Sequence, residues 1–335
     1  MNDRSATPFG QATLGYAPGK VILFGEHAVV DGQPAIAATI DRGIRVAVSE
    51  RNGDDGPILR STNPSLPALC RPNPHGEGPE RLREALRVIV ELCGPATRRL
   101  QFFVDGAIPA GAGLGSSAAL AVALLRGIHQ FSGQPIDDET LIERAFALEK
   151  VFHGTPSGVD HTTIVRGGVL SYVKPRDAAT GTATSLTLPR RIRLAVGVAG
   201  PHAGTATAVT SLRERARRHA DHHQRIFDGI GALSRSARGH LEKGELGAVG
   251  ELMDLNQGYL NALGVSTPAI EALCAIARER GALGAKLSGA GGGGAVIALV
   301  DDDPEPVRRA FAAAGYTAFS TTLSSASTAS FSEET

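Results

Sequence analysis

Residues 109–119 read PAGAGLGSSAA and separate two apolar runs: LQFFVDG at 100–106, typical of a strand, and AALAVALLRGI at 118–128. The second run is apolar on nearly every side, which predicts a central, buried helix. Glycines let backbone N–H groups approach an anion, and a helix N-terminus adds roughly half a positive charge. The stretch therefore predicts a phosphate-binding loop, with a tight turn capped by Ser116 or Ser117 as the alternative.

The serines of this loop suggest a second role beside capping. A hydroxyl at the start of a phosphate-binding helix can hold a divalent cation that bridges phosphates. No Gly-Lys-Ser/Thr sequence closes the loop, so it is not a Walker A loop. We expect any nucleotide to be held in a different way.

A second glycine run, SGAGGGG at 288–294, formally satisfies the GxGxxG pattern. A dinucleotide-binding fold requires a helix after these glycines, whereas AVIALV at 295–300 is typical of a strand. The Rossmann interpretation is therefore rejected. The run is also longer than a hairpin turn requires, which favours a second close approach of backbone to a ligand.

Four charged positions stand beside apolar runs and together fit phosphoryl transfer. Lys20 precedes VILF at 21–24 and Glu26 follows it, Glu149 shares a helix face with apolar residues, and Asp160 ends a turn-rich loop. In phosphoryl transfer, a carboxylate and a serine can hold Mg²⁺, a second carboxylate accepts or orients the hydroxyl proton, and a lysine offsets negative charge. Each charge taken alone is more often a surface residue.

The order of the expected elements predicts an α+β fold rather than a barrel. The second domain is expected to begin near residue 190, giving an N-terminal domain at 1–190 and a C-terminal domain at 191–335. Residues 1–12 and 320–335, at least beyond Thr322, are expected to be polar ends with little to bury. Strands are expected at 21–24, 35–40, 44–49, 100–106, 168–173, 192–199, 284–288 and 295–300. Helices are expected at 82–93, 118–128, 137–152, over much of 205–280, and at 307–314.

Composition excludes several classes of protein. The 335 residues carry 34 Lys and Arg against 34 Asp and Glu, so no net charge draws the chain to nucleic acid or to a membrane. No window approaches 18 uninterrupted apolar residues, and the N-terminus lacks a signal-peptide pattern. Three widely spaced cysteines, Cys70, Cys93 and Cys274, argue against a disulfide framework and fit a reducing cytoplasm.

Two other clusters carry no function in this interpretation. The arginines between 213 and 225 are interrupted by acidic residues and lack interleaved aromatics, so a solvated helix face is favoured over nucleic-acid binding. His219 and His223 have a helical spacing compatible with zinc, but no third ligand or HExxH pattern accompanies them.

Taken together, the motifs resemble the GHMP small-molecule kinases. The resemblance covers about residues 15–300. The three motifs shared across the family are APGKVILFGEHAVVDG at 17–32, IPAGAGLGSSAA at 108–119 and KLSGAGGGGAV at 286–296. Two further stretches, EKVFHGTPSGVD at 149–160 and LNQGYLNALGVSTP at 255–268, are more specific within it.

The resemblance implies a two-domain α+β fold with the active site in the cleft between domains. It also implies ATP- and Mg²⁺-dependent phosphorylation of a small alcohol, with the C5 hydroxyl of mevalonate as the expected acceptor. By resemblance, Asp160 is the base or hydroxyl-orienting carboxylate, Lys20 its catalytic partner, and Ser117 and Glu149 are the metal ligands. The residues implied to bind the nucleotide are Pro109, Gly111, Gly113, Leu114, Gly115, Ser116 and Ser117. Those implied to bind the substrate are Lys20, Glu26, His27, Asp160, Thr205, Gly291 and Gly292.

Some positions depart from the family pattern. Asp31, His161 and Ala295 stand where other residues are usual, and the basic residues often found near Thr205 are missing, so the way the substrate carboxylate is held stays open. The alternatives are a GHMP kinase of another alcohol, such as phosphomevalonate or a sugar, and a nucleotide-binding sensor without catalysis. A plain interaction protein is a third class. The oligomeric state is open, with a homodimer among the alternatives.

Overall fold

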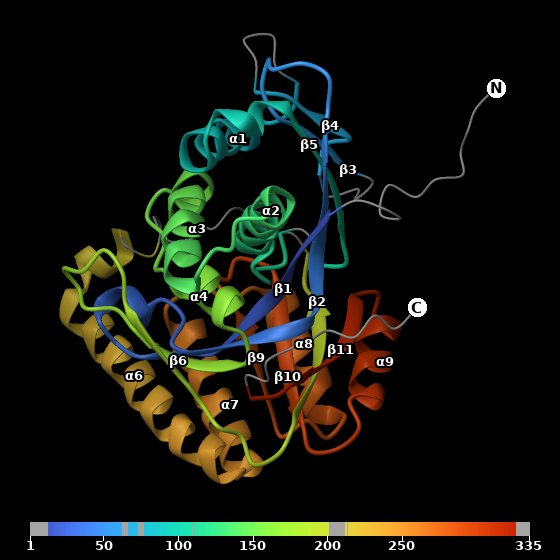
Figure 1. Ribbon diagram of the computed structural model, residues 1–335. Helices are drawn as coiled ribbons and strands as arrows, with labels where there is room; N and C mark the ends of the chain where they lie inside the picture. Colours follow the sequence, from blue (N-terminus) through green and yellow to red (C-terminus); the bar gives the residue numbers. More distant parts are fainter. Residues whose placement is uncertain are drawn as a thin grey trace. The chain divides into compact units, whose positions relative to one another are not determined.

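The computed structural model describes residues 13–61, 66–72, 77–109, 111–200, 212 and 214–325. The chain divides into two compact units that are interleaved in the sequence. The first unit consists of Met1–Gly19, Arg42–Pro109 and Gly115–Pro156, and the second of Lys20–Asp41, Ala110–Leu114 and Ser157–Thr335. The elements of both units are labelled in Figure 1.

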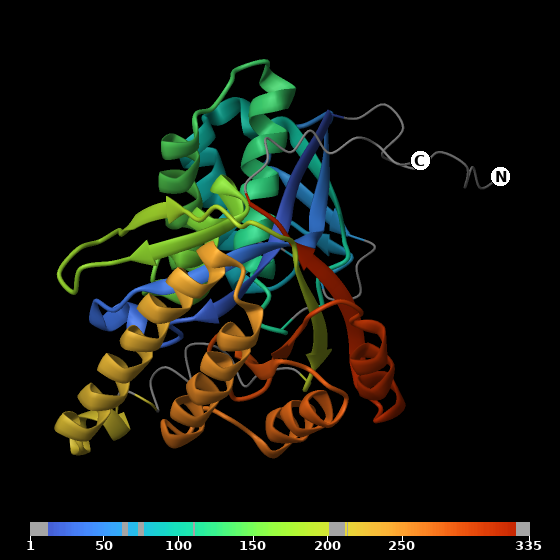
Figure 2. The same cartoon turned by 90° about the horizontal axis from the view of Figure 1, so that it is seen from below.

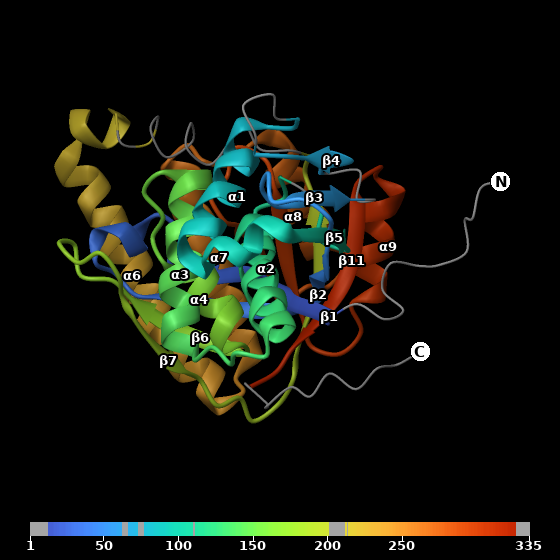
Figure 3. The same ribbon diagram turned by 45° about the horizontal axis from the view of Figure 1, so that its top comes forward.

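The first unit pairs a sheet with three helices. Its strands lie in the order β4 (Leu69–Cys70), β3 (Ile58–Ser61), β5 (Leu100–Gly106) and the later residues of β2 (Ala35–Glu50). The helices are α1 (Glu80–Cys93), α2 (Ser116–Ser132) and α3 (Asp138–His153), and a short 3₁₀ helix, η2, covers Pro95–Arg99. The three α-helices lie together beside the strands (Figures 1 and 3). Helix α2 is buried from Ala118 to Leu125, as its apolar sequence predicts.

The ends of these helices follow from local sequence. Helix α3 begins after Asp137, whose carboxylate accepts hydrogen bonds from the backbone N–H of Thr140 (2.9 Å) and from its hydroxyl (2.8 Å). Helix α1 ends at Gly94, as predicted. The alternative of a turn capped by Ser116 or Ser117 is wrong: the N-cap of α2 is Gly115, which has a positive φ, and Ser116 is already the first helical residue.

The second unit contains strands of two sheets. The first residues of β2 pair with β6 (Val169–Val173), and β6 pairs with β7 (Thr182–Ser185). Strand β1 (Thr13–Phe24) pairs with β2, and its last five residues, from Lys20, belong to this unit. A separate four-stranded antiparallel sheet has the order β11 (Thr317–Leu323), β8 (Ile192–Val198), β10 (Ala295–Val300) and β9 (Gly284–Ser288).

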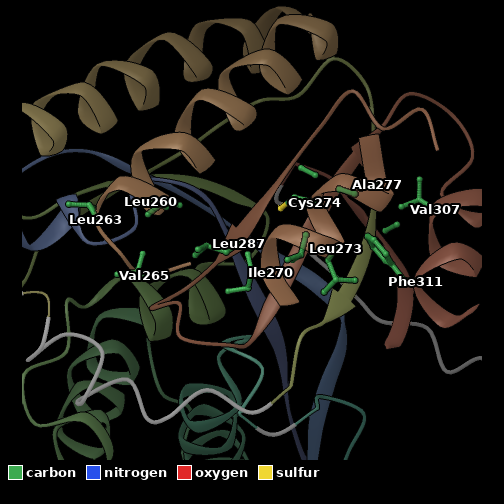
Figure 4. Packing of buried hydrophobic residues seen from close by; sticks show 14 of the residues in the cluster. Leu260, Leu263, Val265, Ile270, Leu273, Cys274, Ala277, Leu287, Val307 and Phe311 are labelled. Atoms are coloured by element: carbon green, nitrogen blue, oxygen red, sulfur yellow. The ribbon is translucent and has the colours of Figure 1, made fainter. Parts of the chain in front are cut away.

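The helices of the second unit are α4 (Val159–Arg166), α6 (Ala220–Lys243), α7 (Leu246–Ala262), α8 (Pro268–Glu279) and α9 (Glu305–Ala313), with the 3₁₀ helix η1 at Ala28–Asp31. Residues of α6 to α9 form a core with this four-stranded sheet, whereas Val159 of α4 packs with residues of β1, β2 and β6. Helices α6 and α7 pack side by side (Figure 2). Leu273 and Cys274 of α8, Phe311 of α9 and Leu287 of β9 belong to one cluster of buried residues (Figure 4).

Helix α7 also covers one edge of the four-stranded sheet. Strand β9 is the last strand and pairs with β10. Two of its backbone N–H groups donate hydrogen bonds to side chains of α7: Ala285 donates to Asp254 Oδ1 (2.9 Å), and Leu287 donates to Gln257 Oε1 (2.9 Å). Side chains of one helix therefore take the place of a further strand.

Most predicted elements are confirmed, and the α+β class with them. Three further expectations are wrong. Residues 35–50 form one strand rather than two; its first residues, Ala35–Ala38, pair with β6 and its last, Ile44–Glu50, pair with β5. Asp160 lies in the first turn of α4 and not in a loop. Residues 320–323 belong to β11, where Leu323 pairs with Ile192 and is fully buried.

Among the described residues, no helix is both long enough and apolar enough to cross a membrane.

Candidate active site

Strand β1 places Lys20 beside the first glycine loop. The Lys20 backbone N–H donates to the carbonyl of Leu114 (2.9 Å), and its ammonium donates to the carbonyl of Gly113 (3.2 Å). The same ammonium lies 3.1 Å from Asp160 Oδ1. Lys20, Gly113 and Asp160, which the sequence separates by more than 40 residues each, thus meet within the second unit.

Asp160 is presented by the N-terminal turn of α4, which begins after Gly158. Its side chain is 30% exposed, whereas that of Lys20 is 3% exposed. The next residue, His161, is buried, and burial lowers its pKa to about 4, although the Asp160 charge acts in the opposite direction. His161 is therefore neutral at pH 7, and Lys20 is the cation that faces the carboxylate.

The two glycine runs touch each other through their backbones. A Cβ added to Gly113 would stand 3.0 Å from the carbonyl oxygen of Ser288, and one added to Gly289 would stand 3.3 Å from the carbonyl oxygen of Gly113. Both glycines also have positive φ, of 73° and 97°. Only glycine accommodates both the conformation and the approach at these two positions.

The remaining loop residues continue the chain into α2. Gly111 and Gly115 also have positive φ, and Leu114 is buried. Pro109 immediately precedes this loop, and Ser116 and Ser117 form the first turn of α2. The prediction of a glycine loop that leads directly into a buried helix is thereby confirmed.

In the first unit, Ser117 and Glu149 meet at a residue that the sequence analysis did not single out. His153 Nε2 lies 2.8 Å from Ser117 Oγ and 3.9 Å from Glu149 Oε2. Glu149 is 1% exposed, as its helix face predicts. His153 is four residues after Glu149 on α3, so its helical spacing was the available signal.

The oxygen atoms of Ser117 and Glu149 are of the kind that a magnesium ion accepts as ligands. Mg²⁺ prefers oxygen ligands and commonly binds one or two protein groups, with phosphates and waters completing its shell. A serine hydroxyl and a carboxylate supply two such oxygens. Among the described residues, no group of three or more His, Cys, Asp or Glu side chains could hold a metal unaided.

Glu26 and His27 follow β1 and contact the second glycine run. Glu26 is 1% exposed and forms an ion pair with Lys286 of β9. Nε2 of His27 lies 3.1 Å from the carbonyl oxygen of Ala290. Burial lowers the pKa of His27 to about 4, and the charges of Arg215 and Lys286 lower it further, so the ring is neutral at pH 7.

The other residues predicted to bind the substrate are Gly291 and Gly292 of the second glycine run, and Thr205. Gly292 donates its N–H to the carbonyl of Val265 (2.7 Å), and a Cβ on Gly291 would stand 2.2 Å from the same oxygen. Thr205 lies outside the described residues. The sequence analysis also gave no role to Lys286 or to Asn256, whose side chain contacts Glu26, although both lie in quoted motifs. The available signal was a lysine inside the otherwise apolar strand GAKLS.

Comparison with known proteins gives the same family for two separate regions of the chain. The model for the GHMP kinases N terminal domain matches residues 80–168, and the model for the GHMP kinases C terminal domain matches residues 237–317. The mevalonate kinase of Aeropyrum pernix is 37% identical over 309 residues, which cover 86% of this chain and 89% of that protein. The mevalonate kinase of Methanothermobacter thermautotrophicus is 36% identical, with 85% and 91% covered.

A solved structure agrees with these relatives. The crystal structure of L. major mevalonate kinase in complex with R-mevalonate superposes with a TM-score of 0.78 at 28% identity, covering 94% of this chain and 96% of that one. The family models, the sequence relatives and the fold all agree, and this chain belongs to the GHMP kinase family.

Proposed function

We propose that this protein is a mevalonate kinase, which transfers the terminal phosphoryl group of ATP to the C5 hydroxyl of mevalonate. The observation that carries the proposal is the meeting of Lys20, Asp160 and the Gly113 carbonyl in the second unit. A carboxylate, a buried cation and a glycine loop are the parts that phosphoryl transfer to an alcohol requires. The named relatives supply the choice of alcohol.

In this proposal Asp160 accepts or orients the proton of the attacking hydroxyl. Its carboxylate is partly exposed and can reach a substrate, while Lys20 holds it from the buried side. As the proton leaves, negative charge grows on the hydroxyl oxygen, and the Lys20 ammonium stabilises it. A carboxylate base of this kind contributes about 10²- to 10⁴-fold to the rate.

The first glycine loop and the start of α2 bind the nucleotide. Positive φ at alternate glycines turns backbone N–H groups toward an anion, and the N-terminus of α2 favours negative charge. Ser117 and Glu149 are proposed to hold Mg²⁺, which neutralises charge on the phosphates. The residues proposed for the nucleotide are Pro109, Gly111, Gly113, Leu114, Gly115, Ser116 and Ser117.

The acceptor alcohol is proposed to bind on the side of Asp160, Lys20 and the turn that carries His27. His27 is neutral at pH 7 and half-buried, so it recognises the substrate by hydrogen bonding and not by charge. Thr205, Gly291 and Gly292 stay predictions of substrate contacts, whereas Glu26, predicted with them, is fully buried and paired with Lys286.

One assay tests the substrate and the reaction together. The purified protein is incubated with Mg-ATP and mevalonate, and in parallel with phosphomevalonate and with galactose, and products are identified by mass. We expect a product from mevalonate alone, heavier by one phosphoryl group. Product from one of the other alcohols in place of mevalonate indicates another GHMP kinase. No product from any of them contradicts the proposal, and ATP binding measured by calorimetry then separates a nucleotide-binding sensor from a plain interaction protein.

We also propose three properties that do not concern the active site: a domain boundary near residue 190, a cytoplasmic location and a homodimer. The proposed boundary falls between the two regions that the family models match. Light scattering coupled to size-exclusion chromatography measures the last of these.

A further inference from the structure

A fully buried ion pair in the second unit has no part in the proposed reaction. The ammonium of Lys286 contacts Glu26 Oε1 and also donates to the carbonyl of Leu287 (2.7 Å). The other carboxylate oxygen of Glu26 accepts from Asn256 Nδ2 of α7 (3.3 Å). Both side chains of the ion pair have 0% exposure, and both oxygens of Glu26 are engaged.

Stability alone does not account for such a pair. Removing two charges from water costs more than their attraction returns unless geometry and additional hydrogen bonds are excellent, so apolar side chains often stabilise a core equally well. Burial lowers the pKa of Lys286, and the Glu26 carboxylate opposes that effect. A buried pair of this kind is best attested as a device that selects one local arrangement.

The arrangement next to it is unusual. His27 follows Glu26 and has a φ of 62°, and among the described residues no other side-chain-bearing residue has a positive φ. This conformation is costly for a histidine and persists only where its surroundings hold it. Glu26, the residue before His27, is held in place by its ion pair with Lys286. This ion pair therefore helps to hold the His27 backbone in its unusual conformation.

Three contacts join the β1 end to alternate residues of the β9 segment. Lys286 pairs with Glu26, Ser288 Oγ accepts from the Ile22 N–H (2.8 Å), and the Ala290 carbonyl faces His27 Nε2 (3.1 Å). A carbonyl oxygen only accepts, so the neutral ring carries its proton on Nε2. The second ring nitrogen, Nδ1, is then a hydrogen-bond acceptor.

We propose that Lys286 is a positioning residue: through its ion pair with Glu26 it holds the turn in which His27 offers Nδ1 to a hydroxyl of the alcohol substrate. The proposal rests on the proposed function for the identity of that alcohol. In it Glu26 acts through Lys286 and His27 and does not itself contact the substrate. Asn256 completes the shell of the Glu26 carboxylate.

The test uses a variant that removes both charges together. Glu26→Gln or Lys286→Met alone leaves one buried charge without its partner and destabilises the fold, whereas the double variant Glu26→Gln/Lys286→Met removes both. A matched control is Arg278→Met. Arg278 pairs with Asp254 of α7 and donates to the carbonyl of Ala285 beside Lys286, so its loss disturbs the same helix and strand without removing a partner of Glu26.

The first readout is the titration of His27 by NMR without substrate, with its signal assigned by its loss in His27→Gln. We expect the pKa of His27 to rise toward the ordinary value in the double variant, chiefly because the turn is no longer held in its buried arrangement; the loss of the Lys286 charge adds a smaller rise in the same direction. The Arg278→Met control should keep the wild-type titration. An unchanged titration in a folded double variant overturns the proposal.

The second readout is a cycle with His27→Ala. We expect the double variant to lower kcat/KM for mevalonate by about 10- to 100-fold, with the KM for ATP unchanged, as supporting contacts commonly do. If the pair acts through His27, adding His27→Ala to the double variant causes little further loss. Independent, multiplying losses overturn the proposal. If the wild type leaves mevalonate unphosphorylated, the proposed function fails, while the NMR comparison still decides whether the pair holds His27.

Discussion

The ammonium of Lys20 lies 3.1 Å from the carboxylate of Asp160, and the two side chains differ tenfold in exposure, 3% against 30%. The cation is thus shielded from water while the carboxylate stays accessible to a substrate. Electrostatic interactions are stronger where water is excluded, so this asymmetry lets Lys20 act on charge that develops beside Asp160.

The first prediction concerns Asp160. We expect Asp160→Asn to lower kcat by about 10²- to 10⁴-fold, because an amide cannot accept the hydroxyl proton. ATP affinity, measured by calorimetry, should stay within a few fold of the wild type, since the nucleotide loop is untouched. Asp177→Asn, the same change on an exposed aspartate, serves as the control. An Asp160→Asn enzyme as fast as that control contradicts the role given to Asp160.

The second prediction concerns the metal. Ser117→Ala removes a hydroxyl oxygen that also contacts His153, and we expect the Mg²⁺ concentration for half-maximal activity to rise by about tenfold or more. Mn²⁺ binding in the presence of nucleotide, followed by electron paramagnetic resonance, should weaken in parallel. Ser132→Ala, at the other end of α2, should change neither quantity. If Ser117→Ala keeps the metal dependence of the wild type, Ser117 is not a ligand.

The third prediction separates backbone strain from close packing. Gly113 and Gly133 have nearly the same φ, 73° and 68°, but a Cβ on Gly133 would have no atom within 4 Å. Alanine at either position should cost about 1–2 kcal/mol of unfolding free energy for the left-handed backbone. Gly113→Ala should cost more, because its Cβ would stand 3.0 Å from the Ser288 oxygen, and ATP binding should weaken with it. Equal urea midpoints for the two variants would argue against tight contact between the glycine runs.

The fourth prediction concerns pH and the start of α3. Hydrogen bonds from the backbone N–H and then the hydroxyl of Thr140 lower the pKa of Asp137 below its ordinary value of 3.8. A carboxyl with a lowered folded-state pKa stabilises the fold above its unfolded pKa, and the contribution is lost as pH falls through the folded pKa. Asp137→Ala should therefore lower the melting temperature at pH 7 and have a diminishing effect below about pH 4. A difference that is the same at pH 7 and pH 3 would contradict this linkage.

The sequence predicted the parts of the fold that are governed by local patterns. Strand β5, helix α1 and the glycine loop before α2 lie where their apolar periods and turn residues indicate. The burial of Glu149 also followed from its helix face. For the site, the two glycine runs and the four charged residues were predicted because each stands next to an apolar run, and because together they fit the needs of phosphoryl transfer.

The rest depended on contacts between distant segments. Nothing local indicates that Lys286 faces Glu26, 260 residues earlier, or that α7 supplies Asn256 to the same carboxylate. Helix α4 was missed because its β-branched residues have low helix propensity and follow a run of turn residues. Strand β11 was missed because its polar residues alternate with only two buried apolar side chains, Phe319 and Leu323.

The outer edge of β9, which α7 covers, affects how the protein associates with itself at high concentration. Bare strand edges recruit strands from other molecules, which is a common beginning of aggregation and of domain swapping. Here Asp254 and Gln257 already occupy the N–H groups of Ala285 and Leu287. A newly arriving chain would have to displace α7 before it could extend the sheet there, so this helix protects the molecule from self-association through that edge.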